Sequence, residues 1–186
     1  GLGDVYKRQE SYTGKIFESA MASLDQVHHS LDMSAINRAV DLLTQAKKIA
    51  FFGLGSSAAV AHDAMNKFFR FNVPVIYSDD IVLQRMSCMN CNDDDVVVII
   101  SHTGRTKSLV ELAQLAREND AMVIAITSPG TPLSRESTLA ITLDVPEDTD
   151  IYMPMVSRLA QLTVIDVLAT GFTPVSYTHL RAHETL

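Results

Sequence analysis

Three short segments of the chain combine glycine with hydroxyl side chains. They are Gly53-Leu54-Gly55-Ser56-Ser57, Ser101-His102-Thr103-Gly104-Arg105-Thr106 and Thr127-Ser128-Pro129-Gly130-Thr131. Glycine lets backbone N–H groups approach an anion closely, and serine and threonine hydroxyls donate further hydrogen bonds to its oxygens. Arg105 is the only fully charged side chain in the three segments. One such segment is compatible with ordinary turn chemistry, whereas three together indicate a binding site for a phosphate-bearing ligand.

The residues around these segments alternate between helical and strand patterns. Apolar residues at helical spacing predict helices at residues 16–31, 36–43, 57–68, 81–89, 108–116 and 153–168. Short apolar runs predict strands at residues 49–52, 73–77, 96–100, 122–126 and 139–143. The run at 96–100 is β-branched throughout and apolar on both faces, which is typical of a parallel strand covered by helices on both sides.

This alternation predicts an α/β fold, a three-layer αβα sandwich around a five-stranded parallel sheet of the flavodoxin-like type. Ligands of such sheets bind beyond the carboxyl ends of the strands, where the strand order reverses. Each glycine and hydroxyl segment directly follows a predicted strand, so all three are expected at that edge, together with residues 78–80. The predicted ligand-binding residues are Gly53, Gly55, Ser56, Ser57, Ser101, His102, Thr103, Gly104, Arg105 and Thr106.

Composition restricts the classes of function. The net charge is −7 and there is no basic run, which makes this chain by itself a poor binder of nucleic acid. No apolar run is long enough to span a membrane, and no secretory signal opens the chain, so we expect a cytoplasmic protein without membrane partners. Cys88 and Cys91 form a single C-x-x-C pair, which we interpret as ordinary thiols. No cofactor, metal site or catalytic residue is predicted.

The two ends of the chain differ from the middle. Residues 1–9 and 174–186 show neither strand nor helix periodicity, and we expect them to be non-native or disordered. The domain is therefore predicted to occupy residues 10–173.

A dinucleotide site is an alternative interpretation of the first segment. Gly53-x-Gly55-x-x-Ala58 fits the dinucleotide-binding fingerprint, and Asp79 lies near the position of the acid that would hold a ribose. A dinucleotide, however, usually needs its phosphates held once, and the segment at 101–106 repeats the same phosphate-binding chemistry.

The paired loops at 53–57 and 101–106, in this order and context, resemble the SIS (sugar isomerase) phosphosugar-binding domain. A second resemblance is to the closing helix of RpiR-type transcriptional regulators. The segment that carries it is Ser157-Arg158-Leu159-Ala160-Gln161-Leu162 with Ile165-Asp166. The likeness covers about residues 11–173 and is greatest to the HexR-type subgroup. It implies a sensor that binds 2-keto-3-deoxy-6-phosphogluconate or a related phosphorylated sugar or sugar acid, with Ser56, Ser57, Ser101, Thr103 and Thr106 on the ligand.

The same resemblance raises two further expectations. Members of the family bind DNA through an N-terminal helix-turn-helix domain, which is not expected before Glu10 of this chain. SIS domains also occur in sugar-phosphate aldose–ketose isomerases, for which His62 and His102 are candidate bases. Many of those isomerases carry an acid directly after the second loop, whereas Lys107 stands there in this chain, so binding without catalysis is expected.

The predicted closing helix is apolar around nearly its whole circumference. Packing on one face of a sheet cannot bury such a helix completely, and an exposed apolar surface usually marks an association site. We therefore expect a homodimer formed through helices.

Overall fold

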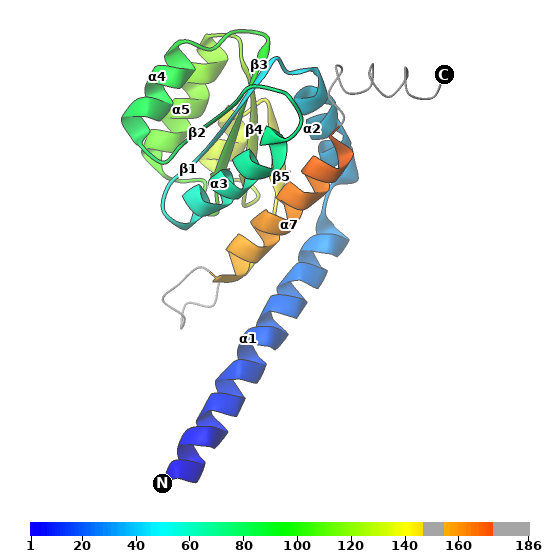
Figure 1. The fold of residues 1–186 in the computed structure, drawn as a ribbon, viewed down its shortest axis with the longest axis vertical. Coiled ribbons are helices and arrows are strands. Elements are labelled where there is room, and N and C mark those ends of the chain that lie inside the picture. Colours follow the sequence, from blue (N-terminus) through cyan, green and yellow to red (C-terminus); the bar gives the residue numbers. More distant parts are fainter. Residues whose placement is uncertain (147–154, 173–186) are drawn as a thin grey trace, which may run out of the picture.

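The computed structural model describes residues 1–146 and 155–172 and confirms the predicted α/β fold (Figure 1). In chain order the elements are α1 (Leu2–Ser30), α2 (Met33–Gln45), β1 (Lys48–Gly53), α3 (Ser56–Phe69), β2 (Val75–Ser78), α4 (Ile81–Met89), β3 (Asp95–Ser101), α5 (Lys107–Glu118), β4 (Met122–Thr127), α6 (Pro132–Glu136), β5 (Leu139–Thr142) and α7 (Met155–Gly171).

The five strands form one parallel sheet with the order β2-β1-β3-β4-β5. This is the flavodoxin-like order, in which the chain first moves from β1 to one edge and then crosses back to build the other side. The switch point therefore lies between β1 and β3. Strand β3 pairs on both sides and is buried along its whole length, as its apolar sequence predicts.

Helices cover both faces of the sheet. Neighbouring phenylalanines of β1 point to opposite faces, as alternate strand residues must: Phe51 packs in one hydrophobic cluster and Phe52 in the other. The Phe51 cluster contains buried residues of α2, α3 and α7, and the Phe52 cluster contains buried residues of α4, α5 and α6. The predicted three-layer arrangement is thus confirmed.

Helix α1 projects from the α/β body, and only its carboxyl-terminal part reaches the core (Figure 1). It begins at Leu2, so residues 2–9 are helical and not disordered, whereas the expectation that residues 1–9 are non-native stays a prediction. Periodicity fails as a signal there because residues 1–13 are all exposed and no apolar face is needed. The expectation for residues 174–186 lies outside the described residues. No helix in the described parts of the chain is both long and apolar enough to cross a membrane.

Candidate functional site

The loops after β1 and β3 separate at the switch point. The first loop leads into α3, which packs on the Phe51 face, and the second leads into α5, which packs on the Phe52 face. The amino-terminal ends of two helices on opposite faces therefore meet at the switch point on the carboxyl edge of the sheet, where ligands of such folds bind. Each helix start leaves backbone N–H groups without an intrahelical acceptor, and its dipole favours an anion.

The first loop is shaped by its two glycines. Gly55 is the N-cap of α3 and has φ +60° and ψ −130°, a conformation that side chains strongly disfavour. A Cβ on Gly53 would lie 2.7 Å from the backbone oxygen of Ser57, so glycine allows α3 to start directly against β1. Ser56 and Ser57 lie in the first helical turn and do not cap the helix; Ser56 is exposed and Ser57 is buried.

The second loop is held in shape by its own hydroxyl groups. The Ser101 hydroxyl accepts a hydrogen bond from the Gly104 N–H at 3.1 Å, and the Thr103 hydroxyl accepts one from the Arg105 N–H at 3.3 Å. Thr106 is the N-cap of α5, but its side chain makes no capping bond. Ser101 and Thr103 can each still donate a proton, because in these bonds they act only as acceptors.

Gly104 rests on two buried threonines of the third loop. It has φ +59°, and a Cβ at this position would overlap the Oγ1 atoms of Thr127 and Thr131. Those two hydroxyls lie 3.3 Å apart and are hydrogen bonded. The loop after β4 is also tied to the second loop by Ser128, whose N–H and hydroxyl both donate to the His102 carbonyl, at 3.2 and 2.6 Å.

The hydroxyl groups of the site therefore fall into two sets. Those of Ser101 and Thr103 already accept bonds that build the second loop. Those of Ser56, Ser57 and Thr106 make no hydrogen bond to any residue in the described ranges. The second set, at the starts of α3 and α5, makes no bond within the described ranges that would compete with a ligand.

Positive charge at this edge of the sheet comes from the second loop and the first residue of α5. Arg105 and Lys107 are both exposed, and the Lys107 ammonium lies 3.8 Å from Glu111 on the next helical turn. Lys67 does not contribute, because it lies in the last turn of α3 and pairs with Asp63 at 3.6 Å and with Asp166 of α7.

The candidate bases for isomerisation lie in different settings. His62 is exposed on α3, where its ring packs edge-on against Tyr77 with 5.0 Å between ring centroids. His102 is half-buried in the second loop. The two cysteines are free and buried, and burial raises the pKa of the Cys88 thiol to about 12, which disfavours thiolate chemistry.

Sequence reasoning missed Gln84, a fully buried residue of α4. Its side-chain Nε2 donates to the carbonyl oxygens of Gly53, at 3.1 Å, and Ser78, at 2.8 Å. The available signal was a glutamine one helical turn before buried Cys88, on the inward face of a short helix.

The SIS domain family matches residues 42–171 of the chain. The chain therefore belongs to the SIS domain family, as its paired loops predicted.

Individual relatives confirm the resemblance to HexR-type regulators of the RpiR family. The chain is 92% identical over 164 residues to the HTH-type transcriptional regulator HexR of Escherichia coli K12, an alignment that covers 88% of this chain and 57% of that protein. It is 58% identical over 164 residues to HexR of Pseudomonas aeruginosa, covering 88% of this chain and 58% of the relative. The chain thus spans little more than half the length of these relatives.

A solved structure with the same fold contains a sugar phosphate. The Vibrio vulnificus NanR protein complexed with ManNAc-6P superposes with a TM-score of 0.80 and is 27% identical, over 90% of this chain and 64% of that chain.

Proposed function

We propose that this chain is the phosphosugar-sensing effector domain of a bacterial transcriptional regulator of sugar catabolism. The observation that carries the proposal is the convergence of residues 53–57 and 101–106 at the switch point, where α3 and α5 begin with hydroxyl residues that make no capping bond. The NanR complex supports a sugar phosphate as the ligand class, because that related protein holds one. The resemblance to HexR-type regulators favours 2-keto-3-deoxy-6-phosphogluconate or a close relative.

We infer that the domain binds its ligand without converting it. Lys107 follows the second loop where many SIS isomerases carry an acid, and its side chain is 90% exposed and faces Glu111. The relatives named above are regulators and not enzymes by name. DNA binding is assigned to a helix-turn-helix segment outside this chain, because the net charge of −7 opposes contact with phosphate backbones.

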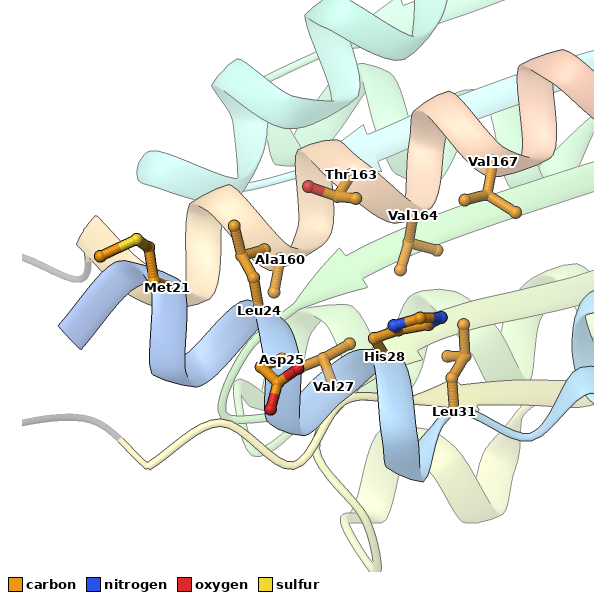
Figure 2. Close-up of a pocket in the computed structure, with 10 residues that line it drawn as sticks. All are labelled: Met21, Leu24, Asp25, Val27, His28, Leu31, Ala160, Thr163, Val164 and Val167. Carbon is orange, nitrogen blue, oxygen red and sulfur yellow. The ribbon is translucent and has the colours of Figure 1, made fainter. Parts of the chain in front are cut away.

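A second copy of the chain is the proposed protein partner. Helices α1 and α7 enclose an apolar groove of about 450 Å³, and Figure 2 shows side chains from both helices lining it. The groove is lined by Met21, Leu24, Asp25, Val27, His28, Leu31, Ala160, Thr163, Val164 and Val167. Exposed apolar residues continue along α1 beyond the groove, including Phe17, which is 66% exposed. An apolar groove together with exposed apolar side chains on the same helix fits an isologous dimer.

A thermal-shift series tests the sensor proposal. The ligands are 2-keto-3-deoxy-6-phosphogluconate, other hexose and pentose phosphates, unphosphorylated gluconate, NAD⁺ and NADP⁺. A ligand at about 100 times its Kd stabilises the folded protein by about 2.7 kcal/mol, which corresponds to a rise in Tm of about 5–10 °C for a domain of this size. A rise with sugar phosphates alone is expected. A rise with NAD⁺ or NADP⁺ alone would instead establish the dinucleotide alternative.

A further inference from the structure

Gln84 connects helix α4 to the start of the first loop. Its side-chain amide donates from Nε2 to the Gly53 carbonyl at the end of β1 and to the Ser78 carbonyl at the end of β2. The residue has no exposed surface. A buried amide is unfavourable unless it is hydrogen bonded, so these two bonds are what allow a glutamine at this position.

The backbone pattern of β1 shows what the bond to Gly53 does. The Ile49 N–H donates to the Pro74 oxygen, so alternate residues of β1, including Gly53, direct their backbone polar groups toward β2. Nε2 of Gln84 thus supplies the donor that a further residue of β2 would have supplied. Because a trans peptide unit is planar, the N–H of Leu54 points away from the Gly53 carbonyl, toward β3. The second loop begins on that side.

Gly53 is also restrained from the helix side. The Ser57 backbone oxygen lies 2.7 Å from the position of a Cβ on Gly53, which leaves no space for a side chain there. The Oε1 atom of Gln84 is buried and has no hydrogen-bond partner among the described residues. An apolar side chain would avoid this unpaired acceptor. What an apolar side chain lacks, and the glutamine amide supplies, is a single nitrogen whose two protons are donated to two carbonyls.

We propose that Gln84 is a positioning residue of the ligand site, whose two donated bonds hold the first peptide units of the 53–57 loop in the orientation that binds phosphate. This inference rests on the proposed function of that loop. Gln84 itself does not contact the ligand, because its side chain is covered. It acts through Gly53, and it also ties the loop to α4 and to the end of β2.

The first test removes both donated bonds with Gln84→Met, which keeps the length of the side chain. Calorimetric titrations use inorganic phosphate and 2-keto-3-deoxy-6-phosphogluconate as probes. We expect the Kd for both to rise by about tenfold or more, the size of one lost hydrogen bond to a charged group. Gln114→Met, at an exposed position of α5, is the matched substitution control. Ile36→Val, at a buried position of α2, is a second control that lowers the stability of the domain away from the loops. Both control variants should bind the probes with the Kd of wild type.

The second test distinguishes positioning from simple structural support. In Gln84→Glu an ionised carboxylate faces two carbonyls and has no proton to donate, whereas the protonated acid can donate to one of them. The ratio of its Kd to that of wild type, measured at the same pH, should therefore fall toward one as the pH is lowered. Because wild type is measured at the same pH, the ratio cancels the effect of phosphate ionisation on the Kd. The Gln84→Glu series also tests the positioning role if Gln84→Met does not fold.

The outcomes separate the two proposals. If wild type binds the probes and either Gln84→Met binds equally well or the Gln84→Glu ratio is independent of pH, the positioning role is overturned and the sensor function stands. If wild type binds neither inorganic phosphate nor any sugar phosphate, the sensor function fails and the role of Gln84 fails with it.

Discussion

Replacing Gly104 with alanine should damage both the stability of the domain and its ligand site. The residue has φ +59°, and for an L-residue this left-handed conformation costs about 1–2 kcal/mol. The new methyl group would also overlap the buried hydroxyls of Thr127 and Thr131, and overpacking of this kind costs about 1–3 kcal/mol. The smaller conformational entropy of the unfolded alanine chain returns about 0.4–1 kcal/mol. The expected net loss is about 1–5 kcal/mol.

Gly130→Ala is the matched control for the Gly104 variant. Gly130 lies in the neighbouring loop with φ +68°, but open space surrounds its Cβ position. Only the backbone strain applies there, so its expected loss is about 1 kcal/mol. Urea unfolding followed by circular dichroism gives both values, and calorimetry with a sugar phosphate gives the effect on binding. Equal losses in the two variants would refute the reasoning, because they would show that the threonines move aside at no cost.

The remaining predictions concern the hydroxyls, a thiol, turnover and assembly. Ser101→Ala should weaken sugar-phosphate binding in calorimetry by about 1–3 kcal/mol, since a bond to a charged group is lost; unchanged affinity with an intact fold would contradict it. Thr106→Ala should weaken binding while leaving the urea midpoint unchanged, because the side chain makes no capping bond, and a lower midpoint would contradict that assignment. The raised pKa of Cys88, caused first by burial, means that the unfolded chain loses this proton first. Cys88 should therefore lower the stability by about 1.4 kcal/mol per pH unit between pH 9 and its folded pKa of about 12. In urea titrations at increasing pH, Cys88→Ala should show a smaller slope than wild type, and part of the slope should remain because the pKa of Cys91 is also raised. NMR in deuterated water should show no proton exchange at the second carbon of sugar phosphates, and exchange would support the isomerase alternative. Met21→Asp, at a side chain 61% exposed beside the apolar groove, should give monomers in analytical ultracentrifugation, whereas Ala22→Asp on the other side of α1 should not; a monomeric wild type would refute the dimer.

The parts of the fold that the sequence predicts are those that burial makes obligatory. Strand β3 is recognisable because a strand covered on both faces has to be apolar at every position. Helix α6 was not predicted, because five residues beginning at Pro132 are too few to show a period. The first part of α1 was not predicted for the opposite reason: its residues face solvent, so no packing constraint leaves a pattern in the sequence.

The sequence predicts that the three loops share one edge of the sheet, but it does not predict the contacts within and between them. Glycines and hydroxyls after parallel strands identify the loops, since strand polarity brings them to one edge. The support of Gly104 by Thr127 and Thr131 depends on packing between residues more than twenty positions apart. The bond from Gln84 to Gly53 spans 31 positions and depends on where α4 lies over the sheet. Neither contact has a local sequence pattern.

The divergence of α3 and α5 to opposite faces has a consequence for optical detection. A molecule bonded to both loops touches the start of a helix in each outer layer, so its arrival changes the surroundings of residues on both sides of the sheet at once. The chain contains no tryptophan, so a single tryptophan introduced into either layer would be the only indole fluorophore of the domain. Two such variants, one per layer, would report a bridging ligand with the same midpoint, whereas a ligand held by one loop would change the emission of only one of them.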